Sequence, residues 1–436
     1  MGSGVGNRPC LTTQSLIVVL HSPVSDCNTP MHVLYFHQHF STPAGSTGTR
    51  SYEMARRLIQ RGHAVTMVCG LYQVAKTGLK GLPANGLRKG IVDGIEVIEI
   101  NLPYSNYDSF IRRSITFIKF ALRSITIALG TDYDLLFATS TPLTAGIPGI
   151  VMKFFKPRKP FVFEVRDLWP ALPREMRVIT NPLILKMMSL LEWLSYHAAN
   201  RCIGLAPGIV RGIERRGIPS RCMVMIPNGC DLDLFQPVAE KKSRLPGVNQ
   251  GDFTAVFTGA HGIANGLDAV LNAAGVLLAR ERKKIKLVFI GDGKLKPHLK
   301  ERARRERLTN CLFFDPVPKI ELAGIIANMD AGLMILANCP AFYEGTSPNK
   351  FFDYIAAGLP VLNNYPGWLA GLIRENNCGL AVEPESPEAF ADALSHLADH
   401  PEACREMGEN ARRLAESRFD RRELSDQFVD FLEGIP

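Results

Sequence analysis

The sequence predicts an α/β protein of two Rossmann-like domains, each built on a parallel sheet, that face each other across a cleft. The chain has 436 residues, which is more than one hydrophobic core usually supports. Its composition, 46% hydrophobic and 21% charged, is that of a soluble globular protein. Short apolar runs alternate with segments of helical period through both halves, as in sheets covered by helices.

Residues 1–30 differ from the rest of the chain because they are rich in Gly, Ser and Thr. Their one apolar run, at 16–20, is too short to span a membrane, and only Arg8 precedes it, which disfavours a signal peptide. Gly6 stands where a myristoylation motif needs Ser or Thr. We expect a dispensable extension, with the folded protein starting at Met31.

The first domain is expected to span residues 31–210 and begins with a buried strand at 31–36. A loop rich in Gly, Ser and Thr follows, then a helix at 50–61 and a second strand. Free amides of a loop before a helix favour phosphate or substrate, although polar loops are often merely solvated. The glycines at 45 and 48 lack the GxGxxG spacing, which disfavours an NAD site.

Residues 111–130 mix apolar side chains with cations and contain no acid. This pattern is typical of a helix that lies on an anionic membrane surface. A helix packed on the sheet with its cations turned outward would look the same, and one helix can do both. Charges interrupt every apolar stretch, so a spanning helix is not expected. The predicted membrane-facing residues are Arg112, Arg113, Lys119 and Arg123.

Polar residues follow the predicted strand at 160–165: Arg166 and Asp167, with Trp169 close behind. Open α/β sheets hold their chemistry at the carboxyl ends of strands, so we expect a functional role here. A buried salt bridge between Arg166 and Asp167 is the structural alternative.

The second domain is expected at 211–418, with strands predicted at 253–258, 286–290, 311–314 and 331–336. A final amphipathic helix falls within 419–436. The ten cysteines show neither zinc nor disulfide spacing, which indicates reduced thiols in a cytosolic compartment. Asp231 and Asp233 invite a metal interpretation, but two acids in one turn are common, and we expect no metal.

The most informative stretch is 344–362, a Gly/Ser/Pro loop followed by a short helix from about 349 and a strand after Gly358. Free amides at a helix N-terminus attract anions. Lys350 adds a cation in the first turn, where the helix dipole alone would favour an acid, so an external anion is indicated. Asp353 lies on the same face one turn later and suits hydroxyl groups. A capped surface helix with an idle lysine is the alternative.

This arrangement, with the Pro-Asn-Gly stretch at 227–229 and Asp-Leu-Trp-Pro at 167–170, resembles the retaining glycosyltransferases of family 4, which have the GT-B fold. Their pattern is Glu, seven residues, Glu, small residues, Gly, x, Pro, Val. Asp353 takes the second acidic place, whereas Gly345 stands at the first, so that acid is absent or supplied by Glu344. The spelling at 346–354 is similar to the fucosamine-type transferases of bacterial O-antigen and capsule clusters.

The resemblance implies transfer of a sugar, N-acetylated amino or deoxy, from a nucleoside diphosphate donor, with UDP expected. The acceptor implied is a polyprenyl-diphosphate-linked saccharide at the inner membrane, and the reaction retains the anomeric configuration. No cofactor, metal or nucleic acid is implied. Family members hold the donor phosphates with an Arg and a Lys near the places of Ala260 and Asn265, so we expect Lys350 to supply the charge.

The site residues expected from the motif and the resemblance fall into three groups. Those expected to be catalytic are Asp353, Glu344, Arg166 and Asp167. Those expected to bind the donor are Gly259, His261, Gly262, Lys319, Thr346, Ser347, Asn349 and Lys350. Those expected to line the cleft are Gly45, Gly48, Thr49 and Arg50, and in the family the last helix crosses back to the first domain.

Two other functions fit the same pattern. One is a GT-B relative acting on soluble sugars, such as a sucrose or glycogen-type synthase or a nucleotide-sugar epimerase. The other is a non-catalytic sugar-nucleotide-binding or scaffold protein, which the missing cations near 260 and 265 and the displaced Glu344 would favour.

Overall fold

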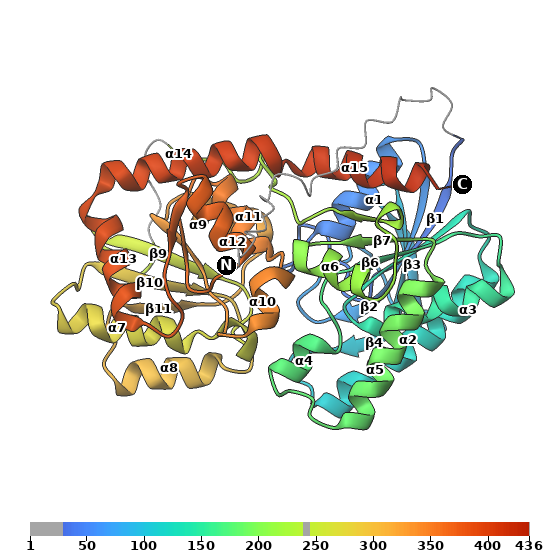
Figure 1. The fold of residues 1–436 in the computed structure, drawn as a ribbon, viewed down its shortest axis with the longest axis horizontal. Helices are drawn as coiled ribbons and strands as arrows, with labels where there is room; N and C mark the ends of the chain where they lie inside the picture. The colour runs from blue at the N-terminus through green and yellow to red at the C-terminus, as the bar shows by residue number, and fades with distance from the viewer. Residues whose placement is uncertain (1–28, 239–244, 436) are drawn as a thin grey trace, which may run out of the picture.

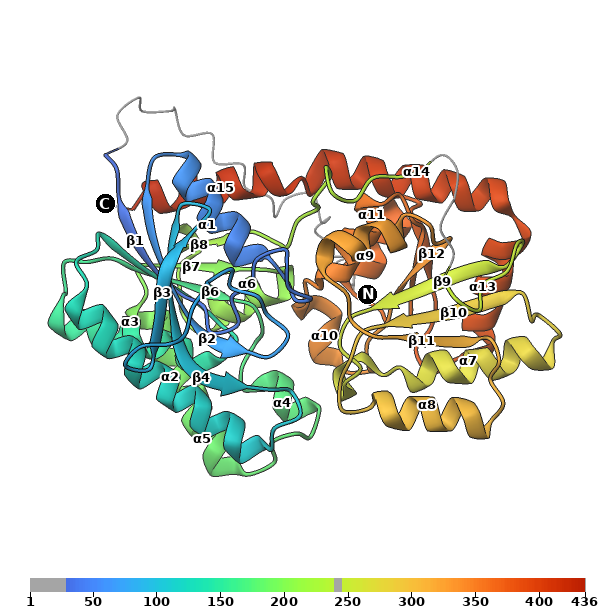
Figure 2. The same ribbon diagram turned by 180° about the vertical axis from the view of Figure 1, so that it is seen from behind.

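The computed structural model of the protein describes residues 29–238 and 245–435. Two α/β domains lie side by side, and a long helical stretch at the C-terminal end runs along both of them (Figures 1 and 2). The predicted fold class, two parallel-sheet α/β domains, is confirmed. The expected extension at 1–30 falls almost entirely outside the described residues.

The first domain contains an eight-stranded sheet in the order β3-β4-β2-β1-β5-β6-β7-β8. Every neighbouring pair is parallel except β3 and β4, which form a hairpin closed by Asp93 and Gly94, both with positive φ. Asp-Gly is favoured at such a turn because both positions need that conformation. The strands are β1 (His32–Phe36), β2 (Ala64–Tyr72), β3 (Leu87–Val92), β4 (Ile95–Tyr104), β5 (Leu135–Thr139), β6 (Phe161–Val165), β7 (Arg201–Gly204) and β8 (Met223–Met225).

Helices on both faces of this sheet bury its apolar runs. The Ser109 hydroxyl caps the helix at 110–130 by accepting from Arg112 N. The Asn181 side chain caps the helix at 182–198 by accepting from Leu183 N and Ile184 N. Such caps satisfy amides that have no partner within the helix. The helices are α1 (Arg50–Gln60), α2 (Phe110–Gly130), α3 (Ile147–Phe155), α4 (Ala171–Glu175), α5 (Pro182–Ala198) and α6 (Pro207–Arg215).

The second domain contains a six-stranded parallel sheet in the order β11-β10-β9-β12-β13-β14. Its strands are β9 (Phe253–Thr258), β10 (Ile285–Ile290), β11 (Cys311–Phe314), β12 (Ala331–Met334), β13 (Val361–Asn363) and β14 (Gly379–Ala381). Its helices are α7 (Asp268–Ala279), α8 (Lys296–Arg305), α9 (Lys319–Ile326), α10 (Pro340–Gly345), α11 (Asn349–Ala356), α12 (Trp368–Glu375), α13 (Pro387–Asp399) and α14 (Pro401–Arg418).

The boundary between the domains differs from the expectation at residue 210. Helix α6 covers the first sheet, and β8 extends that sheet by pairing with β7, so the first domain continues to about residue 225. The sequence reasoning stopped too early because β8 has only three residues and makes a weak apolar run.

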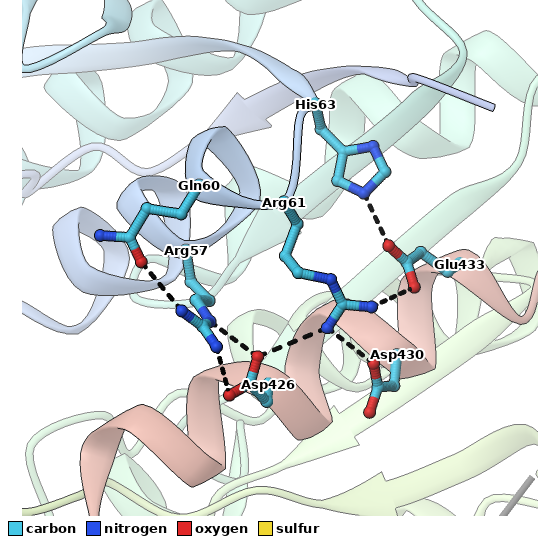
Figure 3. Close-up of polar contacts among 7 residues, drawn as sticks. All are labelled: Arg57, Gln60, Arg61, His63, Asp426, Asp430 and Glu433. Atoms are coloured by element: carbon cyan, nitrogen blue, oxygen red, sulfur yellow. Dashed lines mark hydrogen bonds and ion pairs between the residues drawn. The ribbon is translucent and has the colours of Figure 1, made fainter. Parts of the chain in front are cut away.

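Helix α15 (Arg421–Glu433) leaves the second domain and packs on α1 of the first. Its apolar face is buried, and the Phe428 ring lies 5.1 Å from that of Phe137 in β5. Charged side chains flank this contact (Figure 3). Those of α15 are Asp426, Asp430 and Glu433, and they meet Arg57, Arg61 and His63 at distances of 2.6 to 3.4 Å. The C-terminal helix therefore ties the second domain to the first.

Candidate active site

A cavity of about 320 Å³, which we call the interdomain cavity, lies between the two sheets at the carboxyl ends of their strands. The glycine-rich loop before α1 and the loops after β2 and β4 form its first wall. The ends of β9 and β10 and the first turns of α9 and α11 form the second. Ligands of open α/β sheets bind at this edge.

Lys350, in the first turn of α11, has an enclosed ammonium group at this cavity. Its Nζ donates to Asn265 Oδ1 at 2.7 Å and lies 4.1 Å from the centre of the Phe257 ring. Gly259, at the end of β9, lies beside the lysine side chain and has a φ of +125°, a conformation that favours glycine. Burial lowers the pKa of Lys350 to about 7, and no carboxylate pairs with it among the described residues. A buried cation without a counter-charge favours an anionic ligand.

Asp353 lies one turn further along α11 and is also buried at the cavity. Burial raises the pKa of its carboxyl to about 6, although Lys319, whose Nζ is 4.0 Å from Oδ1, opposes the shift. Oδ1 has no hydrogen-bond partner in the part of the chain that the structure describes. A buried acceptor of this kind suits a ligand hydroxyl.

The two domains touch at the N-terminus of α11. A Cβ at Gly48 would stand 2.6 Å from Asn349 Nδ2, so a larger residue there would push the Asn349 amide group aside. Asn349 Oδ1 is buried without a partner. Of the predicted site residues, the interdomain cavity brings together Gly48, Gly259, Lys319, Asn349, Lys350 and Asp353.

Lys319 joins three parts of the chain at the same place. Its Nζ donates to Thr49 Oγ1 of the first domain at 3.1 Å and pairs with Asp231, which lies between β8 and β9. Asp231 also pairs with Arg421, and although burial alone would raise the pKa of Asp231, Arg421 and Lys319 lower it. Lys319 is therefore already neutralised, which leaves Lys350 as the uncompensated cation at this cavity.

A second bridge across the cavity was missed by the sequence analysis. Tyr107, in the loop after β4, donates its hydroxyl to Asp292 Oδ1 at 2.6 Å, and Lys294 Nζ donates to Asp108 O at 2.9 Å. Asp292 belongs to the Gly-Asp-Gly turn after β10, which the sequence shows plainly. Nothing in the sequence indicated that the loop before α2 would meet that turn.

Glu344 is not at the interdomain cavity, contrary to the expected catalytic role. It lies at the end of α10, where Oε2 accepts from Arg211 Nη2 at 2.8 Å, and it lines a separate cavity of about 890 Å³. The position eight residues before Asp353 is Gly345, and Glu344 does not reach back into the site. The first acid of the pattern is therefore missing here.

Arg50 is a structural residue, not a cleft-lining one. Its guanidinium is fully buried, pairs with Glu164 at 2.9 Å and donates to the carbonyl oxygens of Ile226 and Pro227 at 2.9 and 2.6 Å. Its side chain therefore links α1 to β6 and to the residues that follow β8. Gly45 does not line the interdomain cavity, but its carbonyl accepts from Lys319 N at 3.3 Å.

Arg166 and Asp167 lie at the carboxyl end of β6, outside the interdomain cavity. The alternative of a salt bridge between them is not observed. Arg166 Nη1 lies 3.4 Å from His37 Nε2, and Thr141 Oγ1 donates to Asp167 Oδ2 at 3.0 Å. Burial raises the pKa of Asp167, with Thr141 and Arg166 opposing the shift.

Four predicted donor-binding residues do not line the interdomain cavity. His261 is buried among Phe257, Phe289 and Phe313, and burial lowers its pKa to about 4. Gly262 begins a short 3₁₀ turn. Thr346 and Ser347 are held by protein contacts: Thr346 Oγ1 donates to Phe342 O, and Ser347 accepts from Asn228.

Helix α2 packs one face on the domain and exposes the other. Phe120, Ala121, Ser124 and Ala128 are buried against the domain, whereas Arg112, Lys119 and Arg123 are exposed. Arg113 differs from its expected membrane-facing position because it is half-buried, with an enclosed Nε that has no partner among the described residues.

No group of three or more His, Cys, Asp and Glu side chains suited to a metal occurs in residues 29–238 and 245–435. Asp231 is paired with Lys319 and Arg421, and Asp233 pairs with Arg422. No helix of the same described ranges is long and apolar enough to cross a membrane.

Two family models match the chain, one for each domain. A glycosyl transferase 4-like domain matches residues 45–229, and the glycosyl transferases group 1 model matches residues 238–414. These limits agree with the domain boundary in the structure.

Among curated proteins, a D-inositol 3-phosphate glycosyltransferase of Corynebacterium glutamicum is 28% identical over 205 residues, which are 44% of this chain and 47% of the relative. The O-antigen chain mannosyltransferase C of Escherichia coli is 24% identical over 186 residues, 41% of this chain and 46% of that protein. The chain thus spans about half the length of the curated relatives it matches.

Solved structures share the fold over nearly the whole chain. Sucrose-phosphate synthase from Thermosynechococcus elongatus has a TM-score of 0.72 at 16% identity and covers 92% of this chain and 98% of its own. The Anabaena protein HepE in complex with UDP-glucose has a TM-score of 0.66 at 17% identity and covers 93% and 100%. With a family model on each domain and GT-B structural neighbours, the protein belongs to the family 4-type glycosyltransferases of the GT-B fold.

Proposed function

We propose that the protein transfers a glycosyl group from a nucleoside diphosphate sugar, with UDP as the nucleotide, to a hydroxyl of a phosphorylated, lipid-linked acceptor, with retention at the anomeric carbon. The observation that carries this proposal is the uncompensated ammonium of Lys350 at the N-terminus of α11, facing the interdomain cavity. An anionic diphosphate supplies the charge that the protein lacks there.

The physical demand of the reaction is to stabilise the departing diphosphate. Lys350 and the first amides of α11 provide positive charge and hydrogen-bond donors for the phosphates without a metal. Asp353 offers its unpartnered oxygen to a hydroxyl of the donor. Since the first acid of the family pattern is missing, no candidate nucleophile stands at that place, and we propose a front-face attack in which the leaving phosphate helps to deprotonate the acceptor.

Known relatives support the choice of substrates. A structural neighbour, the Anabaena protein HepE, has been solved in complex with UDP and with UDP-glucose. Other relatives are a D-inositol 3-phosphate glycosyltransferase, a sucrose-phosphate synthase and an O-antigen chain mannosyltransferase. The first two are named after a phosphorylated polyol and a phosphorylated sugar, and the third after a surface polysaccharide. The Thr-Ser-Pro-Asn-Lys spelling at 346–350 favours an N-acetylated amino or deoxy sugar in the donor.

Two apolar stripes on the outside of the first domain support attachment to a membrane. On α2, Ile111, Ile115, Ile118 and Leu122 are 47 to 70% exposed, at the spacing of one helix face, with Arg112, Lys119 and Arg123 along one flank. On α5, Leu183, Met187, Leu190 and Leu194 form a second exposed stripe with the same spacing. Exposed apolar stripes beside cations bind the surface of an anionic membrane.

Both helices contact α3, whose end exposes Phe154 and Phe155, and Figure 1 shows the three helices on the same side of the first domain. Large exposed apolar surfaces mark interaction sites in soluble domains. These surfaces support our proposal that the protein acts at the cytoplasmic face of the inner membrane, where lipid-linked saccharides for O-antigen or capsule are assembled.

A thermal-shift titration of residues 31–436 with UDP, GDP, ADP and NAD tests the donor proposal. Stabilisation by UDP should grow with concentration, as linkage requires. In Lys350→Ala the UDP affinity should fall by roughly 10- to 150-fold, the equivalent of a charge-assisted contact of about 1.5–3 kcal/mol. Lys300→Ala, an exposed cation on α8, is the control and should keep wild-type affinity. No shift with any nucleoside diphosphate, or a shift with NAD alone, would contradict the proposal.

A further inference from the structure

A second and larger cavity lies at the domain boundary, between α4, α5 and α6 of the first domain and α10 of the second, and its volume is about 890 Å³. Helix α10 contacts α4 and α6 in this region, which Figure 1 shows at the junction of the two domains. We call it the basic cavity, after the five cations that line it: Arg174, Lys186, Arg211, Arg215 and Arg216.

All three acids in the wall of the basic cavity are already engaged. Glu344 pairs with Arg211 at 2.8 Å, and Glu192 pairs with Arg216. Glu175 accepts from the backbone N of Ala341 at 2.7 Å and so caps the start of α10.

Three cations of the basic cavity are left without an acid. Arg174, Lys186 and Arg215 come from α4, α5 and α6 respectively, and none pairs with a carboxylate within residues 29–238 and 245–435. Like charges held around one cavity repel each other, and an anion placed between them relieves that repulsion. Arginine and lysine at such a site suit a phosphate group.

The basic cavity is close to the proposed donor site. Gly345 lies in its wall, and Lys350, five residues later, lies in the wall of the interdomain cavity. Five residues span at most about 17 Å, so the two walls are within the length of a sugar nucleotide. A ligand in the basic cavity is therefore within reach of a sugar nucleotide bound at Lys350.

Helix α5 connects the basic cavity to the apolar stripe. Lys186 and Ser189 line the cavity, whereas Met187 and Leu190, on another face of the same helix, belong to the exposed stripe. A lipid whose chain lies along the stripe could place its head group beside Lys186 without leaving the helix.

We infer that the basic cavity is the subsite for the phosphate or diphosphate group of the acceptor, with Arg174, Lys186 and Arg215 as its ligands. This inference rests on the proposed function and adds to it the place where the acceptor phosphate binds and the residues that hold it. A diphosphate on a lipid and a phosphate on a soluble sugar share this chemistry, so the experiment must separate the two sources.

The test uses the full chain saturated with UDP, so that added phosphate cannot compete for the donor site. In one arm, inorganic pyrophosphate is titrated by thermal shift. In the other, flotation measures binding to phosphatidylcholine vesicles with and without polyprenyl phosphate. The variant Lys186→Ala/Arg215→Ala is compared with Lys284→Ala/Lys300→Ala, which removes the same charge from exposed positions of the second domain.

We expect at least one probe to bind the wild type and the control, and to bind the Lys186→Ala/Arg215→Ala variant about tenfold or more weakly. Binding of the vesicles only when they carry polyprenyl phosphate assigns the site to a lipid-borne acceptor, and binding of pyrophosphate alone assigns it to a soluble phosphorylated one. Equal binding by the two double variants, or no binding in either arm, would overturn the inference. The UDP shift is recorded first, and its absence would count against the donor proposal instead.

Discussion

At the scale of single residues, Lys350 and Asp353 show how burial prepares groups for a ligand. Both lie on α11 at the interdomain cavity, and burial moves both pKa values toward neutrality, to about 7 and about 6. Neither has found a full partner inside the protein: Lys350 has an amide oxygen and a ring, and Asp353 has an oxygen without a hydrogen bond. Perturbed pKa values of this kind cluster at functional sites.

Binding of a nucleoside diphosphate should therefore be coupled to protonation of Lys350. Its pKa is about 7 in the free protein and rises when a diphosphate lies beside it, so a proton is taken up on binding above pH 7. UDP affinity should fall as the pH rises from about 7 to 9, by up to about tenfold per pH unit. Isothermal titration in buffers of different ionisation enthalpy measures the uptake.

Replacement of the ammonium provides the control for this coupling. Lys350→Gln should bind UDP weakly and without proton uptake over the same range. Full uptake in Lys350→Gln would show that another group titrates.

Asp353 should limit stability above pH 6. Because its pKa is raised from 3.8 to about 6 in the folded state, its stabilising contribution is complete below pH 3.8 and is lost as the pH rises through about 6. Asp353→Asn should raise the free energy of unfolding by about 1–3 kcal/mol at pH 7.5, a gain that shrinks between pH 6 and 4. Urea denaturation at several pH values measures it. A variant less stable than wild type at pH 7.5 would show that the contact with Lys319 outweighs the cost of burying the charge.

At the scale of elements, α2 and α5 carry their apolar stripes on the outside of the domain. Met187→Glu/Leu190→Glu should reduce binding to anionic vesicles by about tenfold or more, because each partly exposed side chain contributes roughly 1 kcal/mol on insertion. Flotation with vesicles containing phosphatidylglycerol measures this. Leu82→Glu/Ile91→Glu changes exposed apolar residues elsewhere in the first domain and should leave binding unchanged.

Equal vesicle binding by both double variants would remove α5 from the proposed membrane surface. If Ile115→Glu/Ile118→Glu on α2 also binds vesicles as well as the control does, the proposed membrane attachment is contradicted.

The sequence predicted the strands and helices more successfully than the tertiary contacts of single residues. The apolar runs that became β1, β5, β6, β9, β10 and β12 were visible because a strand buried on both faces is apolar throughout. The helix at α11 was visible from its loop and from Gly358. What the sequence could not show was tertiary placement: Arg50 looked like part of a phosphate loop but neutralises Glu164, and Glu344 looked catalytic but faces Arg211. Long-range partners of this kind leave no trace in local spacing.

At the scale of the whole molecule, α15 makes the second domain depend on the first. Its contribution should come mainly from apolar packing: Phe428→Ala should lower the free energy of unfolding by about 3–5 kcal/mol, because it opens a cavity next to Phe137. Arg57→Ala/Arg61→Ala should cost only about 1–2 kcal/mol, because these ion pairs are about one-third exposed (Figure 3). Urea denaturation compares the two variants. If Arg57→Ala/Arg61→Ala lowers the free energy of unfolding as much as Phe428→Ala does, this ranking is contradicted.

Contacts between the two domains enclose the two cavities on several sides. Tyr107 meets Asp292, Thr49 meets Lys319, and Glu344 meets Arg211, so polar contacts join the domains around both cavities. Tyr107 and Thr49 couple loops of the first domain to a turn and a helix start of the second, and Glu344 couples the end of α10 to α6. A ligand in either cavity therefore touches both domains.

The most direct test of the account is a crystal structure of the protein with UDP. We predict the diphosphate within hydrogen-bond distance of Lys350 Nζ and of the first amides of α11, with a hydroxyl of the ligand on Asp353. A diphosphate bound at another place, such as the loop at Gly45 or the basic cavity, with Lys350 still turned toward Asn265, would contradict it.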